Sequence, residues 1–173
     1  DIMKNKPKKP TLATFIDLTK AYDTIAHHKL LNKLKHNYHF SPTTLDLFAS
    51  SFQARTQSTH IPHAHSKQQT ITHGIPQGST LSTTLFILYI NDIYSTTQHS
   101  TAYTYADDLT LITTADTAAE LQQNAQTDIN NVINYLYNNN LVPNATKTTF
   151  TSFYPQTTIY NLHINKAALT QET

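Results

Sequence analysis

The sequence predicts an α+β fold in which helices pack on one face of a small antiparallel sheet. Short runs of β-branched and aromatic residues are typical of strands. They occur at 11–16, at 147–153 and on both sides of Asp107-Asp108. Apolar residues recur at helical spacing over about 27–36, 80–93 and 117–139. The 173 residues suffice for one domain with a substantial core, and we find neither an internal repeat nor a domain boundary.

The composition is that of a globular protein, with 38% hydrophobic and 10% aromatic residues. Mean hydropathy is −0.43, no apolar run approaches the length needed to span a membrane, and no signal peptide opens the chain. The absence of cysteine excludes disulfides, a thiolate nucleophile and a cysteine-based zinc site. We therefore expect an intracellular protein, in the nucleus or the cytoplasm.

Positive charge is concentrated at the start of the chain. The net charge is +1, but residues 1–36 alone contain eight lysines and three aspartates. Residues 1–10 are rich in lysine and proline and are expected to form an extended lead-in. Such a segment either contacts the phosphates of a nucleic acid or is a solvated, frayed terminus.

The first half of the chain alternates between helical and strand patterns. The apolar strand at 11–16 stops at Asp17, a costly place for a carboxylate unless it faces a cleft or a partner. A turn then leads to the helix at 27–36. Ser41-Pro42 is typical of a helix start, and Leu45, Phe48 and Phe52 are expected to point inward from that helix. Residues 54–73 are polar and β-branched, which predicts a β-hairpin.

Both glycines of the chain lie in one loop, Gly74-Ile-Pro-Gln-Gly78. Glycine permits a positive φ and the close approach of another group, so this loop has a special backbone requirement. Ser79 is expected to cap the helix over 80–93, and Asp116 the helix over 117–139. The latter helix is expected to place these residues in the core: Leu121, Ala125, Ile129, Val132, Ile133 and Leu136.

The adjacent carboxylates of Asp107 and Asp108 are expected at the tip of a hairpin, as a two-residue acidic turn. Two like charges this close repel each other, so they are retained either in water or beside a cation. An exposed turn and a cation site are both consistent with this segment alone.

Three segments form one pattern when they are taken in chain order: Phe15-Ile-Asp17-Leu-Thr-Lys-Ala-Tyr22-Asp23, Gly74-Ile-Pro-Gln77-Gly78-Ser-Thr-Leu-Ser and Tyr105-Ala-Asp107-Asp108. Their order and spacing resemble the palm motifs of reverse transcriptases. The strings TIAHHKLLNKL, TLFILYINDI and LVPNATKTTF are similar to those of the non-LTR (LINE, jockey-like) retrotransposon branch. The resemblance extends from about residue 11 to about 153.

This resemblance implies a polymerase palm with part of the fingers and no thumb, as one domain over 11–173. It also implies an RNA-directed DNA polymerase of retrotransposition, which transfers dNTPs to a primer 3′-hydroxyl. Its partners would be an RNA template, a DNA primer, dNTPs and the rest of a polyprotein, which supplies fingers, thumb and endonuclease. No membrane partner is expected.

The resemblance implies a two-metal site for Mg²⁺, in which Mn²⁺ can replace Mg²⁺. Asp17, Asp107 and Asp108 would be its catalytic carboxylates, and the carbonyl of Leu18 a further ligand. Two such ions clamp the attacking and leaving oxygens of nucleotidyl transfer, and Mg²⁺ prefers hard oxygen ligands held on rigid elements.

The nucleotide-binding residues implied by the resemblance are Tyr22, Gln77, Gly78 and Lys147. Tyr22 would stack under the sugar and exclude a 2′-hydroxyl, whereas its alternative is a half-buried core tyrosine. Gln77 and the backbone at Gly78 would contact the incoming nucleotide and the template. Lys147 would neutralise or protonate the pyrophosphate, whereas its alternative is a solvated lysine.

Other polar residues are expected to be structural. His60, His63 and His65 lie in a polar hairpin without a fixed face, so we do not expect a zinc site there. His27-His28 is expected to be a surface pair at a helix start. Asp23 and Asp92 are expected to cap or to stabilise the fold.

The chain departs from the family pattern in several places. Thr83 follows Ser82 where the family usually has proline, and a tryptophan is replaced in the region of Tyr135 or Tyr137. Because the chain is expected to contain a part of the fingers only, and neither thumb nor endonuclease, the isolated fragment is expected to be inactive. The alternative is a remnant that folds and at most binds nucleic acid. A nucleotidyl cyclase palm would leave the Gly74–Gly78 loop unexplained.

Overall fold

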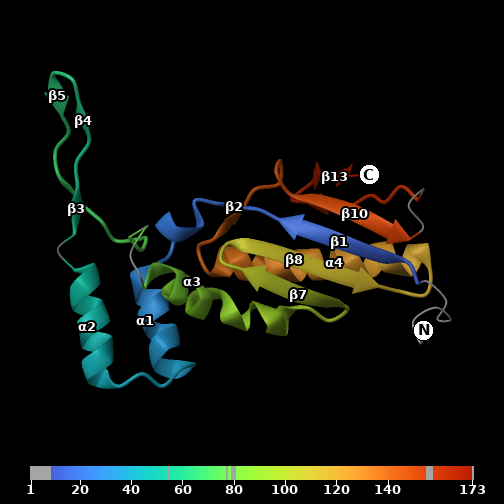
Figure 1. Ribbon diagram of the computed structural model, residues 1–173, viewed down its shortest axis with the longest axis horizontal. Coiled ribbons are helices and arrows are strands. Elements are labelled where there is room, and N and C mark those ends of the chain that lie inside the picture. Colours follow the sequence, from blue (N-terminus) through green and yellow to red (C-terminus); the bar gives the residue numbers. More distant parts are fainter. Residues whose placement is uncertain (1–8, 54, 77, 79–80, 155–157, 173) are drawn as a thin grey trace. The chain divides into compact units, whose positions relative to one another are not determined.

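The computed structural model describes residues 9–53, 55–76, 78, 81–154 and 158–172 of the chain (Figure 1). The chain divides into two compact units. We call residues 1–19 with 91–173 the sheet unit, and residues 20–90 the helical unit.

The sheet unit is built on a five-stranded sheet of order β13-β10-β1-β8-β7. Its strands are β1 (Thr11–Ile16), β7 (Ser100–Tyr105), β8 (Asp108–Thr114), β10 (Thr149–Tyr154) and β13 (Thr170–Glu172). All neighbours pair antiparallel except β10 and β13, which are parallel. The expected small, mainly antiparallel sheet is therefore confirmed.

Helix α4 (Ala118–Asn138) lies along one face of this sheet (Figure 1). Leu12, Thr14 and Ile16 alternate along β1 and are each at most 2% exposed. Of the residues between them, Ala13 is also buried, whereas Phe15 is 42% exposed. All six core positions expected on α4 are buried: Leu121, Ala125, Ile129, Val132, Ile133 and Leu136.

The cap of α4 differs from the expectation. Thr117, not Asp116, caps the helix, because its backbone is extended and its Oγ1 accepts a hydrogen bond from the N–H of Glu120 at 3.2 Å. Asp116 instead pairs with the ammonium of Lys9 at 2.6 Å. That hydrogen bond raises the pKa of Lys9.

The fully buried Asp128 ties the chain before β7 to α4. Its two carboxylate oxygens accept three backbone N–H bonds, from Gln98 and His99 at 2.8 Å and from Ser100 at 2.6 Å. These bonds compensate the buried charge and satisfy three consecutive backbone donors.

Short elements complete the sheet unit. β2 (Leu18–Thr19) pairs with β9 (Val142–Pro143), and β11 (His163–Ile164) with β12 (Ala167–Ala168). The 3₁₀ helix η3 (Asn91–Thr96) packs against α4, where the hydroxyl of Tyr135 bonds to Asp92. The expected structural role of Asp92 fits this contact.

The helical unit contains η2 (Ala21–Asp23), α1 (His27–His36), α2 (Pro42–Phe52) and α3 (Ser82–Ile90). α1 has the predicted bounds, and the Ser41 hydroxyl caps α2 as predicted. Of the three α2 residues expected inside, only Phe52 is buried, since α2 packs mainly on α1. α3 is shorter than the predicted helix over 80–93, and its predicted cap, Ser79, lies outside the described residues.

The predicted hairpin at 54–73 is confirmed as two successive antiparallel pairs (Figure 1). β3 (Thr56–Gln57) pairs with β6 (Gln69–Thr70), and β4 (His60–Ile61) pairs with β5 (Ala64–His65). In the described part of the chain, every helix is too short or too polar to cross a membrane.

Candidate active site

The strand register brings two of the predicted carboxylates together. The last pair between β1 and β8 is Ile16 with Leu109, and the adjoining residues at that end are Asp17 and Asp108. Both line one cavity of about 340 Å³, together with Lys147. A carboxylate ending a buried strand therefore faces a cleft, as expected.

The backbone of Asp17 is held on both sides by the loop before β10. The N–H of Asp17 donates to the Thr148 hydroxyl at 3.3 Å, and its carbonyl accepts the N–H of Asn144 at 2.8 Å. The Thr148 hydroxyl in turn donates to the Asn144 carbonyl at 2.8 Å. Because Lys147 lies between these residues, the same loop carries the cation into the cavity of the carboxylates.

The turn between β7 and β8 is not the expected Asp107-Asp108 turn. Tyr105 pairs with Asp108, so the two turn residues are Ala106 and Asp107, and Asp108 is already the first residue of β8. Ala106 has a φ of 52°, in the left-handed region. The side chain of Asp107 is exposed, and this residue is not among those that line the cavity of Asp17 and Asp108.

No three of the described histidine, aspartate and glutamate side chains lie close enough together to hold a metal ion. The oxygen donors of Asp17 and Asp108 suit Mg²⁺, and Asp107 precedes Asp108 in the sequence. Leu18, whose carbonyl is the fourth predicted ligand, is held in β2 opposite Pro143. The metal roles of these four residues stay a prediction.

The helical unit contains the remaining predicted residues. Tyr22 is half-buried and stacks on the fully buried Phe86, with ring centroids 4.8 Å apart. Gly74 and Gly78 have φ values of 87° and 83°, which confirms the special backbone requirement of their loop. A Cβ at Gly74 would also lie 3.0 Å from the Asp23 carbonyl oxygen. Gln77 lies outside the described residues.

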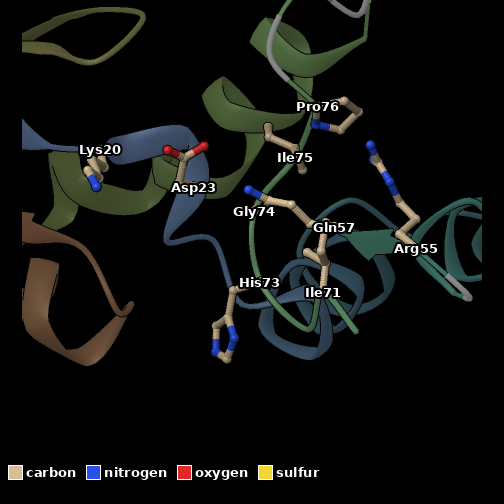
Figure 2. A pocket seen from close by; sticks show the side chains of 9 residues that line it. All are labelled: Lys20, Asp23, Arg55, Gln57, Ile71, His73, Gly74, Ile75 and Pro76. Atoms are coloured by element: carbon tan, nitrogen blue, oxygen red, sulfur yellow. The ribbon is translucent and has the colours of Figure 1, made fainter. Parts of the chain in front are cut away.

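A second cavity, of about 460 Å³, lies within the helical unit. Gly74, Ile75 and Pro76 form one wall, and the basic side chains of Lys20 and Arg55 line it with Asp23 and His73 (Figure 2). Figure 2 shows the guanidinium end of Arg55 directed towards Pro76, whereas His73 points away from the other labelled side chains. We call this space the basic cavity.

Sequence reasoning missed Lys20, Arg55 and His73 as cavity residues. Lys20 stands inside the first motif, and Arg55 is the sole arginine, but neither fact indicates that the two side chains line one cavity. His27 was expected on the surface and instead contacts Gly74 and Phe52. The rings of His60 and His65 pack edge to face at 4.3 Å across β4 and β5.

Comparison with known proteins agrees with the fold and the motifs. Residues 1–168 match the family of reverse transcriptase (RNA-dependent DNA polymerase). The chain is 31% identical over 121 residues to the RNA-directed DNA polymerase from mobile element jockey of Drosophila melanogaster, covering 65% of this chain and 13% of the relative.

Two solved telomerases have the same fold. That of Candida tropicalis, in complex with a fragment of telomeric RNA, matches with a TM-score of 0.66 and 14% identity over 95% of this chain and 30% of its own. That of Candida albicans, also with such a fragment, matches with a TM-score of 0.58 and 14% identity over 92% of this chain and 29% of its own. The chain thus spans less than a third of each relative, and its expected polymerase palm is confirmed. By its match over residues 1–168, this chain belongs to the reverse transcriptase family.

Proposed function

We propose that this chain is the palm of an RNA-directed DNA polymerase, which transfers dNTPs to a primer 3′-hydroxyl in retrotransposition. One observation carries the proposal. Asp17 directly follows β1, Asp108 begins the paired strand β8, and both line a cavity with Lys147. The chain that carries them matches the reverse transcriptase family. Carboxylates from rigid neighbouring strands beside a cation are suited to phosphoryl chemistry.

Asp17, Asp107 and Asp108 would hold two Mg²⁺ ions, with the carbonyl of Leu18 as a further ligand. When bound, such ions activate the attacking hydroxyl and neutralise charge on the leaving group. The chain itself supplies the carboxylate oxygens of Asp17 and Asp108, whose positions are fixed by the pairing of β1 with β8. It also supplies the ammonium group of Lys147, which would neutralise charge on a pyrophosphate. The left-handed backbone at Ala106 supports a turn that brings Asp107 next to β8.

On the helical unit, Tyr22 would select deoxynucleotides, and Gln77 with Gly78 would contact the nucleotide and the template. The stacking of Tyr22 on Phe86 supports this role, because a ring held on a buried partner resists displacement by a 2′-hydroxyl. The basic cavity would receive a phosphate of the RNA template, since Lys20 and Arg55 line it against the single acidic Asp23.

The first test is a titration of this chain with Mn²⁺, monitored by NMR through the amide signals of residues 15–18 and 107–110. We expect both groups of signals to broaden together. Asp17→Asn and Asp108→Asn should each weaken binding more than about tenfold, since even residues that merely orient a metal ligand contribute that much. Asp116→Asn, the same change at the exposed partner of Lys9, should leave binding unchanged.

Primer extension on an RNA template by the full-length protein tests the reaction itself. Asp107→Asn should abolish metal-dependent synthesis while the protein remains folded, and retained synthesis would contradict the assignment. If Mn²⁺ binds equally well to all the variants, the carboxylates do not form the site. The chain would then be a remnant that at most binds nucleic acid.

A further inference from the structure

His27, the first residue of α1, makes two specific side-chain contacts although it was expected on the surface. Its Nε2 lies 2.7 Å from the carbonyl oxygen of Gly74. Its ring stacks on that of Phe52 at a centroid distance of 4.6 Å and an interplanar angle of 18°. Because a carbonyl only accepts hydrogen bonds, Nε2 must carry the proton of this bond.

Gly74 is the position at which the glycine loop meets the chain after the first motif. Its N–H donates to the Ile25 carbonyl at 2.7 Å, and the N–H of Ile75 donates to the Tyr22 carbonyl at 2.9 Å. A Cβ at Gly74 would lie 3.0 Å from the carbonyl oxygen of Asp23, closer than an ordinary van der Waals contact. The backbone carbonyls of residues 22–25 thus hold the N–H groups of Gly74 and Ile75, while the side chain of His27 holds the Gly74 carbonyl.

The other end of the same wall is held by a second side chain. The hydroxyl of Ser82, which is 2% exposed, donates to the carbonyl of Pro76. Ile75, between the two held carbonyls, is 3% exposed. The wall of the basic cavity is therefore fixed by His27 at Gly74 and by Ser82 at Pro76.

We propose that His27 is a positioning residue, whose Nε2–H fixes the Gly74 carbonyl and so keeps the wall of the basic cavity in shape for an RNA phosphate. The inference rests on the proposed function, because that function assigns the basic cavity to the template. Without the bond from His27, the peptide group between Gly74 and Ile75 keeps one hydrogen bond in place of two, from the Ile75 N–H to the Tyr22 carbonyl. The amides of Gly74 and Ile75 would then open more often.

The test uses this chain and a single-stranded RNA oligonucleotide as the probe. His27→Phe keeps a ring on Phe52 but cannot donate, His27→Gln keeps a donor, and His28→Phe is the control at the exposed neighbouring residue. We expect His27→Phe to speed hydrogen exchange of the Gly74 and Ile75 amides about three- to tenfold, as the loss of one hydrogen bond implies. RNA affinity should fall by a similar factor.

His27→Gln should retain the exchange rates and the affinity, and His28→Phe should change neither. Unchanged exchange in His27→Phe overturns the inference. An equal increase of exchange in His27→Gln also overturns it, because a side chain that still has a donor would then fail to hold the Gly74 carbonyl. If the exchange rates change as expected but the wild-type chain binds no RNA, the bond from His27 still fixes Gly74. That result overturns the function proposed for the basic cavity.

Thermal unfolding identifies a variant that fails to fold. If His27→Phe does not fold, His27→Leu is compared with His27→Gln, because these two side chains have similar size and neither has a ring. The glutamine side chain retains a donor and the leucine side chain does not. We therefore expect faster exchange of the Gly74 and Ile75 amides in His27→Leu than in His27→Gln, and equal exchange in both overturns the inference.

Discussion

Ala106 is a non-glycine residue with a φ of 52°, and it stands next to two of the carboxylates. A Cβ in this region crowds the backbone and costs about 1–2 kcal/mol, whereas glycine adopts the same conformation freely. The turn nevertheless forms, because β7 and β8 pair through six residues on each side of it. The pairing of the strands thus holds a strained residue beside Asp107.

Ala106→Gly should therefore raise the free energy of unfolding by up to about 1 kcal/mol, the relief of strain less the greater unfolded-state entropy of glycine. Urea denaturation measures the change. Ala102→Gly, within β7 and nearly buried, is the matched control and should lower the free energy of unfolding by about 1 kcal/mol. Equal losses in both variants would show that Ala106 is not strained.

Helix α4 stabilises the sheet unit in two ways, through its apolar face and through the carboxylate of Asp128. The apolar spacing of α4 made its core residues predictable. The role of Asp128 was not predictable, because its three donors, at Gln98, His99 and Ser100, lie about 30 residues away in the chain. An acidic residue in a helix is ordinarily on the solvated face.

Asp128→Asn should lower the free energy of unfolding by about 2–4 kcal/mol, because an amide has one acceptor oxygen and leaves buried N–H groups unpaired. Chemical denaturation measures the free energy of unfolding of this variant and of the control variant, Asp116→Asn. That control removes only the exposed pair with Lys9 and should cost less than about 1 kcal/mol. A change of less than about 1 kcal/mol in Asp128→Asn would mean that water accepts the hydrogen bonds of these N–H groups in the variant.

Charge is divided unevenly over the whole molecule. The sheet unit has six basic and nine acidic residues, and the helical unit has six basic and two acidic ones. The acidic unit contains the carboxylates proposed for metal binding, and the basic unit contains the cavity proposed for RNA. This division agrees with a site for a cation in the sheet unit and a site for an anion in the helical unit.

RNA affinity should therefore fall with salt in proportion to the phosphates that the helical unit neutralises. Each contact contributes about 0.7 to the slope of log affinity against log salt for single strands. Arg55→Gln should reduce this slope by about 0.7. Lys67→Gln, in the same unit but outside the basic cavity, should leave it unchanged, and equal effects of both would argue for diffuse binding.

The sequence alone predicted those elements and residues that a short stretch of sequence defines. Strand β1, helices α1 and α4 and the motif carboxylates follow from short patterns of apolar and acidic residues. The basic cavity and the contacts of His27 were not predictable, because they join residues about 20 to 50 positions apart through a polar hairpin. The two-residue turn was misplaced by one residue, since only the pairing of Tyr105 with Asp108 defines it.

The alternation of β1 has a consequence for how this gene tolerates mutation. Leu12, Thr14 and Ile16 face the core, and Asp17 follows at the end of the strand. A substitution at an outward position leaves Asp17 in place, but loss of a single codon within 12–16 shifts it to the other face of the sheet or away from Asp108. Copies of this gene should therefore tolerate substitutions at the exposed Phe15, whereas an in-frame deletion anywhere in this segment moves Asp17 from its place beside Asp108.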